Sequence, residues 1–330
     1  MEKSLDKESV ARKNVLRKGS EAEGIAVKGY DFDKGVDYNE IVRSFSSTGF
    51  QASLLAKAVD ITNKMIKDKS FVYLGYTSNM VSSGLRDVFR YLVKNKKVNL
   101  VVTTAGAVEE DIMKCMGDFF LGDFKASGTE LREKGINRIG NIFVSNSRYV
   151  EFEEFFQELL EEIYSEQKKT GKIITASELV WKLGEKINDE RSICYWAWKN
   201  KIKIFCPAIT DGAIGDNIWF FKYRRPDFII DVAEDIKQMN DSVFGQKKTG
   251  AILLGSGVAK HHILNANMFK NGLDYAVYIN NSQEFDGSDA GALPEEAVSW
   301  GKILPGAENV KVFGDATILF PLLVAETFAK

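Results

Sequence analysis

Short runs of β-branched and aromatic residues alternate with segments of helical period from Ser70 onward. This alternation is typical of a parallel sheet whose faces are both covered by helices. We expect helices at 83–94 and 151–167, the second because its apolar residues recur at spacings of three and four. We therefore predict an α/β fold with a doubly wound, mainly parallel sheet. The expected strands are 71–76, 98–104, 202–206, 251–255, 275–279 and 310–313.

The chain has 330 residues, of which 45% are hydrophobic, and it contains five prolines. A chain of this length and composition can bury a large core. Residues 1–29 alternate Lys, Glu and Arg with little apolar content, so we expect a charged amino-terminal extension. We find no linker rich in Pro, Gly or Ser and no internal repeat in residues 30–330, which we predict to be a single domain.

The formal net charge of -2 gives no positive field for nucleic acid. Cys115, Cys194 and Cys206 are odd in number and form no close pair, so we expect a reducing, cytoplasmic location. The start of the chain has no apolar core of a signal peptide. The most apolar stretch, 316–328, is shorter than the roughly 18 residues that span a bilayer, and we interpret it as a buried helix with no membrane partner.

Small and polar residues follow the expected strands, where ligands of open parallel sheets bind. The Gly-Ser-Gly triplet at 255–257 could approach a pyrophosphate at a helix start. Lys260 replaces the third glycine of a dinucleotide fingerprint, however, so a plain tight turn explains the triplet equally well. Asp211 and Asp315 could accept ribose hydroxyls or cap helices. The segments at the strand ends are 75–79, 103–106, 210–212, 255–257, 280–282 and 314–316.

His261 and His262 are the two histidines of the chain, so any role for imidazole in proton transfer falls on them. Adjacent side chains point apart on a helix, and no third ligand is visible, which makes a metal site improbable. A structural role at a helix start and a proton-handling role for one of the two both stay open.

Acidic residues gather near the same strand ends. Glu109, Glu110, Asp111 and Asp216 lie close to two of them, and the segment 283–291 joins three carboxylates to two glycines. A converging sheet would bring several of these charges around one pocket, which would then prefer a cationic ligand. Taken singly, each aspartate is more often a surface or capping residue than a ligand.

Lys302 follows a short segment that suits a helix. Pro294 fits the helix start, Glu296 and Trp300 stand four residues apart, and Gly301 would end the turn. Lys302 would then emerge beside a carboxylate and an indole, among apolar neighbours where loss of water favours the neutral amine. A lone lysine is usually solvated, so this context alone does not select it.

Four segments resemble the deoxyhypusine synthase family. The resemblance runs from about Lys28 to the end of the chain. It implies a Rossmann-like, sirtuin-like NAD-binding fold and a homotetramer, a dimer of dimers whose active sites lie at the dimer interface. The four segments are Gly-Tyr-Thr-Ser-Asn at 75–79, Thr-Thr-Ala-Gly at 103–106, Glu-Phe-Asp-Gly-Ser-Asp at 284–289 and Glu-Ala-Val-Ser-Trp-Gly-Lys at 296–302.

The resemblance also implies roles for individual residues. Lys302 matches the lysine that forms an imine, and His261 matches the proton handler. The implied spermidine site consists of Glu109, Glu110, Asp216, His261, Asp286, Gly287, Ser288, Asp289, Glu296, Trp300 and Lys302. The implied NAD site consists of Ser78, Asn79, Met80, Val81, Ser82, Thr104, Ala105, Gly106, Asp211, Ser256, Asn281, Ser282, Asp315 and Ala316.

The activity implied is a transfer of the aminobutyl group of spermidine to a lysine of the initiation factor five-A precursor. NAD takes up a hydride and later returns it, Lys302 carries the fragment as an imine, and 1,3-diaminopropane is released. One alternative is a homospermidine synthase, whose acceptor is putrescine. Another is a regulatory paralogue that serves as a subunit of a mixed tetramer. Retention of Lys302, Glu296 and His261 argues against the paralogue.

Overall fold

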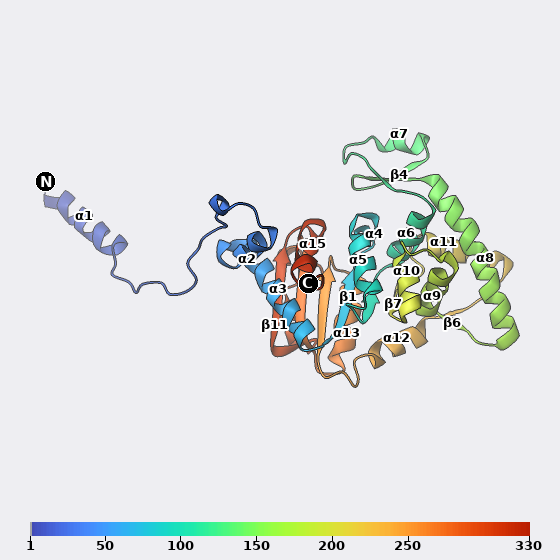
Figure 1. Ribbon diagram of the computed structural model, residues 1–330. Helices are drawn as coiled ribbons and strands as arrows, with labels where there is room; N and C mark the ends of the chain where they lie inside the picture. Colours follow the sequence, from blue (N-terminus) through green and yellow to red (C-terminus); the bar gives the residue numbers. More distant parts are fainter. Residues whose placement is uncertain (1) are drawn as a thin grey trace.

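The computed structural model describes residues 2–330 and contains a central sheet of six parallel strands in the order β11-β10-β9-β1-β2-β7 (Figure 1). From β1 the sheet grows one way through β2 and β7, and the other way through β9, β10 and β11. This order confirms the predicted doubly wound sheet. The strands are β1 (Phe71–Tyr76), β2 (Leu100–Val102), β7 (Lys203–Phe205), β9 (Thr249–Leu254), β10 (Leu273–Asn280) and β11 (Ile303–Phe313).

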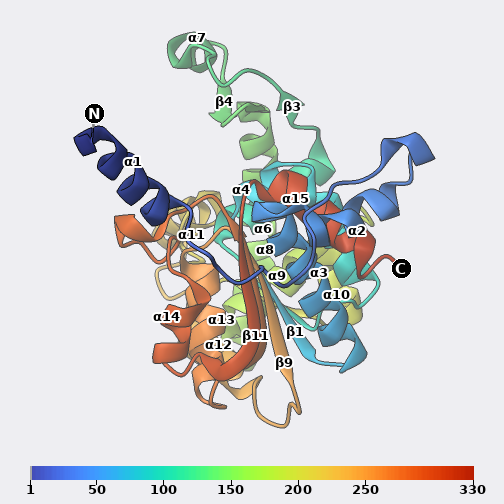
Figure 2. The ribbon, with the colours of Figure 1, turned by 90° about the vertical axis from the view of Figure 1, so that its left-hand side faces the viewer.

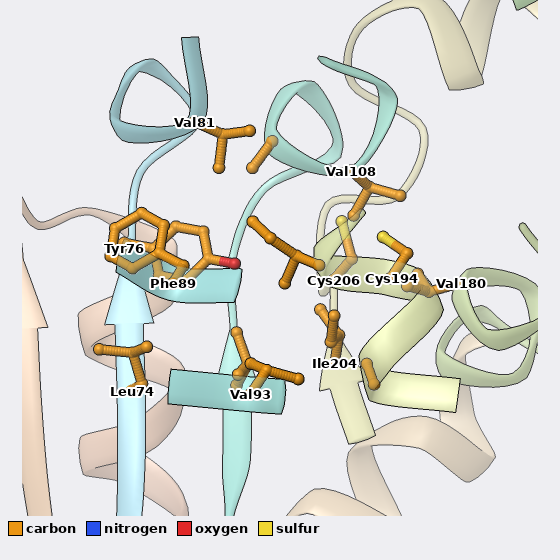
Figure 3. Close-up of a cluster of buried hydrophobic side chains, with 14 of the residues drawn as sticks. Leu74, Tyr76, Val81, Phe89, Val93, Val108, Val180, Cys194, Ile204 and Cys206 are labelled. Carbon is orange, nitrogen blue, oxygen red and sulfur yellow. The ribbon is translucent and has the colours of Figure 1, made fainter. Parts of the chain in front are cut away.

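The central strands are apolar along their whole length because both faces of the sheet are covered. Every residue of β9 is buried, as expected for parallel sheets with helices on both sides. Successive side chains of β1 enter opposite cores: Leu74 and Tyr76 lie in one, and Tyr73 lies in the other. Figure 3 shows Tyr76 against Phe89 in the larger core, with ring centres 4.0 Å apart.

Helices fill both faces of the sheet. Figure 2 shows α12, α13 and α14 on one side of the strands, and α3 and α10 on the other. The larger core includes residues of α3 (Phe50–Lys67), α4 (Asn79–Ser82), α5 (Leu85–Lys94), α6 (Ala105–Met116), α8 (Asn146–Thr170), α9 (Ala176–Ile187), α10 (Ile193–Asn200), α11 (Ala213–Arg224) and α15 (Ala316–Glu326). The smaller core includes residues of α12 (Val232–Asp241), α13 (Val258–Met268) and α14 (Pro294–Ser299), or of the turns beside them.

Most predicted elements appear within a few residues of their expected bounds. Strand β1 has the predicted bounds, and α8 extends beyond the predicted 151–167 at both ends. The largest difference is β11, which begins at Ile303 and not at residue 310. Its first half carries Pro305 and Gly306 and is mostly exposed, as an edge strand permits, so it has no apolar run to reveal it.

An excursion between β2 and α8 stands out from the body of the molecule (Figures 1 and 2). It contains β3 (Phe120–Leu121), α7 (Gly128–Glu133), β4 (Ile136–Ile139) and β5 (Ile142–Ser145), and its strands form an antiparallel sheet in the order β3-β5-β4. A further short pair joins β6 (Ile174–Thr175) to β8 (Ile230–Asp231) in parallel. None of these strands was predicted from the sequence.

The amino-terminal segment contains α1 (Glu2–Val15), which lies apart from the body in Figure 1. Residues 16–29 connect it to η1 (Phe32–Lys34) and α2 (Tyr38–Thr48), and nearly all of them are exposed. The predicted extension at 1–29 is therefore helical over its first half, and the predicted domain boundary stays a prediction. Within residues 2–330, no helix has the length and apolarity that a membrane crossing requires.

Candidate active site

Lys302 and His261 meet at one face of the sheet. The backbone of Lys302 is fixed just before β11, because its N–H donates to Ala297 (2.9 Å) and its carbonyl accepts from Leu273 (3.0 Å). Its Nζ lies 3.4 Å from Nε2 of His261 and 5.4 Å from the ring centre of Trp300. The structure thus joins three residues that the sequence analysis had singled out on separate grounds.

The side chain of Asn265 decides which ring nitrogen of His261 carries the proton. Its Nδ2 lies 3.3 Å from Nδ1 of His261. If this amide donates to Nδ1, a neutral imidazole carries its proton on Nε2, and Lys302 must accept it as a neutral amine. A neutral amine is the form that can attack a carbon.

A cavity of about 550 Å³ surrounds the pair. Half-buried Lys302 faces it, and Trp300 at its rim is 64% exposed, so the lysine is less enclosed within one chain than its apolar neighbours in the sequence suggested. The predicted residues that line it are His261, Gly287, Ser288, Asp289, Glu296, Trp300 and Lys302. It is also lined by Lys260, Leu264, Asn265, Met268, Tyr278, Ala292, Leu293 and Ala297, which the analysis had not proposed for the substrate.

Lys260 is the main residue of the cavity that was not predicted for the substrate site. Its side chain is buried, and its Nζ donates to the carbonyl of Asp289 and lies 3.6 Å from the carboxylate of the same residue. Burial lowers the pKa of Lys260. Ser256 donates to the Asp289 carboxylate at 3.0 Å. Ser256 and Lys260, which both follow β9, therefore hold this part of the acidic segment 283–291. No sequence pattern marks Lys260 for this role, because most lysines are solvated.

His262 points into a different environment. It lines a separate cavity of about 240 Å³ with Phe205, Cys206 and Asp235 among others. Burial lowers the pKa of His262 to about 4, which keeps the imidazole neutral. The two adjacent histidines do point apart, and of the two it is His261 that lies beside Lys302. Among residues 2–330, no group of three or more His, Cys, Asp or Glu side chains could hold a metal ion.

Glu109 and Glu110 form a second acidic group on α6. Glu109 accepts a hydrogen bond from the N–H of Ile214 at 2.8 Å, and Glu110 accepts one from Ser82. Burial raises the pKa of each carboxyl to about 7. Asp216, in the first turn of α11, is exposed, and its negative charge also raises the pKa of Glu109. None of the three residues lines the cavity that holds Lys302.

Asp111 belongs to neither acidic group. It accepts hydrogen bonds from Arg86 Nε (2.7 Å), Ser192 Oγ (2.6 Å) and the N–H of Cys194 (3.0 Å), all in the core. The expectation that Asp111 contributes to a pocket is therefore wrong. Its side chain fixes α5 and α10 against α6.

The residues proposed for NAD lie where the sheet order reverses, between β1 and β9, and around that point. Residues 78–82 form the turn after β1 and helix α4, while 104–106 begin α6. Asn281 and Ser282 follow β10, Asp211 precedes α11, and Asp315 accepts from the N–H of Thr317 as the N-cap of α15. Ligands of doubly wound sheets bind at such a reversal.

Two local features leave polar groups open near the β1–β9 reversal. Thr104 Oγ1, at the start of α6, is buried and has no hydrogen-bond partner in the part of the chain that the structure describes. Ser256 lies between Gly255 and Gly257, both with positive φ, and Gly257 is the N-cap of α13 without a side-chain capping bond. In this tight turn the N–H of Gly255 donates to the carbonyl of Ile279 at 3.0 Å, and Gly257 begins α13, whose first N–H groups lack partners within the helix.

The parallel sheet, together with a lysine and a histidine that share an open cavity on its face, defines an α/β enzyme. A family model described as "Deoxyhypusine synthase" matches residues 40–327. The chain therefore belongs to the deoxyhypusine synthase family, whose members are transferases.

Individual relatives agree with this membership. The chain is 47% identical to a deoxyhypusine synthase of Senecio vernalis, with 100% of this chain and 97% of the relative covered. It is 48% identical to one of Arabidopsis thaliana, with 97% and 95% covered. A crystal structure of a provisionally named deoxyhypusine synthase from Entamoeba histolytica is 37% identical, covers 92% of this chain and 97% of its own, and gives a TM-score of 0.69.

Proposed function

We propose that this chain is a deoxyhypusine synthase that uses NAD to move the aminobutyl group of spermidine to a lysine of the initiation factor five-A precursor. Family membership and the contact between Lys302 Nζ and His261 Nε2 support the proposal. The contact carries the most weight, because it joins a nucleophile to a proton carrier in an open cavity.

Lys302 attacks the oxidised carbon beside the secondary nitrogen of spermidine. A carbon–nitrogen bond to Lys302 forms, the bond to the three-carbon amine breaks, and 1,3-diaminopropane leaves with a proton that His261 supplies. The butyl fragment is then held as an imine on Lys302. The lysine of the protein acceptor displaces Lys302 in the same way, and Lys302 recovers its free amine.

Carboxylates and an indole suit the charge of the substrate. Asp289, Glu296 and the loop residue Asp286 lie at or beside the cavity and would hold ammonium groups. The ring face of Trp300, whose centre lies 5.4 Å from Lys302 Nζ, would bind an ammonium group of the substrate for about 0.5–2 kcal/mol.

The residues at the β1–β9 reversal fit NAD. The unpartnered hydroxyl of Thr104 and the uncapped starts of α6 and α13 offer hydrogen bonds to a dinucleotide. The predicted residues 78–82, 104–106 and 281–282, together with Asp211, Ser256, Asp315 and Ala316, would hold it. Bound NAD would supply a hydride acceptor and later a hydride donor, so the product carries no net oxidation.

We also propose that the chain works as a homotetramer, a dimer of dimers, in the cytoplasm. Glu109, Glu110 and Asp216 lie outside the Lys302 cavity, an arrangement expected if a second copy completes each site. The three free cysteines fit a reducing compartment. Mixing Lys302→Ala and Glu109→Ala variants after dissociation should restore activity that each lacks; continued inactivity of the mixture would argue for sites within one chain.

Trapping of the enzyme imine tests the function directly. Incubation with NAD and spermidine, followed by borohydride reduction and mass spectrometry, should place a four-carbon amine adduct on the peptide that contains Lys302. The Lys302→Ala variant should give no adduct and no labelled acceptor protein. An adduct on another lysine would refute the assignment, and transfer to putrescine but not to the precursor would identify a homospermidine synthase. A chain that is silent alone and active with a homologue would be a regulatory subunit.

A further inference from the structure

The acidic loop at 282–291 is closed at its base. A Cβ on Gly291 would overlap the carbonyl oxygen of Gln283, so the two ends of the loop touch there. Between them, Asp286 accepts from the N–H of Ser288 at 2.7 Å and Phe285 is exposed. A loop of this length with touching ends is a compact unit that can move as a whole.

Lys311 lies directly beneath that base. It pairs in register with Tyr278 of β10, so its side chain leaves the sheet on the face that bears the cavity. Its Nζ donates to the carbonyl of Ser282 at 2.8 Å and to that of Gly291 at 2.5 Å. One ammonium group therefore joins the segment that leaves β10 to the segment that leads into α14.

The ammonium of Lys311 donates its hydrogen bonds to these two carbonyls. Among residues 2–330, no carboxylate lies within 4.0 Å of it. Burial lowers the pKa of Lys311, while Glu284 and Asp286 oppose that shift from a greater distance. Lys260 holds the carbonyl of Asp289 independently. The loop is thus fixed once at its base and once near Asp289.

We propose that Lys311 is a positioning residue that clamps the base of the 282–291 loop and so sets where Asp286 and Asp289 meet a cationic substrate. The inference rests on the proposed function for the identity of that substrate. The clamp itself rests only on the contacts of Lys311. Because these hydrogen bonds have a charged donor, their loss should raise the equilibrium constant for opening of the loop about tenfold.

Amide hydrogen exchange of the Lys311→Met variant tests the clamp without any substrate. Exchange should rise about tenfold in a peptide covering 282–291 and stay unchanged in peptides of α8 and β1. Lys222→Met is a matched control, because Lys222 also donates to two backbone carbonyls, those of Pro226 and Phe228, at the end of α11. Unchanged exchange in the loop, or an equal rise throughout the chain, would overturn the proposal.

Steady-state kinetics test the consequence for the substrate. Lys311→Met should raise KM for spermidine about tenfold and change kcat by less than about twofold, because the bonds lost hold the binding loop and not the nucleophile. Lys311→Arg, which keeps the charge and donors, should recover part of the loss. An unchanged KM, or a loss in kcat alone, would contradict the role. If the unmodified chain used no spermidine, the proposed function would fail while the exchange result still decided the clamp.

Discussion

Lys302 and His261 stand 41 positions apart in the chain, and their side chain nitrogens lie 3.4 Å apart. The contact depends on two elements that meet on one face of the sheet, α13 and the start of β11. His262, one residue later, is half-buried on another side of the same helix, where loss of water lowers its pKa to about 4. The helix thus places two adjacent imidazoles in different surroundings, one beside the amine of Lys302 and one at the separate cavity.

Substitution of the two histidines should separate these roles. His261→Ala should lower kcat by about 10²- to 10⁴-fold, the usual range for loss of a general acid or base. His262→Ala should leave kcat within a few-fold and instead lower the melting temperature slightly, since it enlarges the separate cavity beside Phe205 and Cys206. Activity and thermal unfolding of both variants measure this; equal losses of kcat would contradict it.

Glu110 should make folding stability depend on pH. The carboxyl has a pKa of about 7 in the folded chain against an ordinary 4.5, so between these values the folded state keeps a proton that the unfolded chain releases. Stability from this group therefore falls as pH rises from about 4.5 to about 7, by on the order of 3 kcal/mol. Urea unfolding at several pH values should show that the free energy of unfolding of the Glu110→Gln variant lacks this dependence on pH. If the free energies of both proteins fell in parallel with rising pH, Glu110 would not be the cause.

Asp111 should be more important for stability than for activity. Asp111→Ala leaves the buried Arg86 without its partner and removes the acceptor of Ser192 and Cys194, a loss of about 3–5 kcal/mol. Asp227, in an exposed pair with Lys168 at 2.9 Å, is a suitable control. Its replacement by Ala should cost far less stability than the loss of Asp111, because solvent screens the exposed pair. Chemical denaturation compares them, and similar losses would show that the Asp111 network adds little.

Lys114 should support the turn that we propose holds NAD. Its Nζ donates to the carbonyls of Val81 (2.7 Å), Ser82 (2.5 Å) and Ser83 (3.1 Å), and burial lowers its pKa to about 8. Lys114→Met should weaken NAD binding about tenfold by releasing the end of α4. A fluorescence titration with NAD measures the effect.

Lys199→Met provides the control for that titration. Its ammonium donates to Tyr195 Oη at 2.9 Å, and it caps no helix end. NAD affinity should be unchanged. If both variants bound NAD as tightly as the unmodified chain, the carbonyl contacts of Lys114 would be irrelevant to the cofactor.

The sheet could be predicted because its strands are buried on both faces and therefore read as apolar runs. β1 and β9 are examples. The excursion at 118–145 could not, because β3 and β4 are two and four residues long and mostly exposed. Such strands have neither apolar runs nor regular alternation.

The site was only partly readable from the sequence. Motif resemblance selected Lys302 and His261, but periodicity could not tell which histidine faces the lysine. Asp111 and Glu110 are adjacent in sequence, yet Asp111 enters the core while Glu110 turns toward Ser82. The direction of a helical side chain depends on the tertiary contacts of the helix, which a single sequence does not contain. The roles assigned to individual NAD and spermidine contacts stay predictions.

The sheet order affects how the chain can fold while the ribosome synthesises it. Phe71 of β1 aligns with Thr249 of β9, so one long edge of a central apolar strand stays without its neighbour until most of the chain has been synthesised. During that interval β1, β2 and β7 form an incomplete half-sheet whose open edge can pair with other nascent chains. The reversal at which a dinucleotide would bind is therefore created late in synthesis, when β9 emerges.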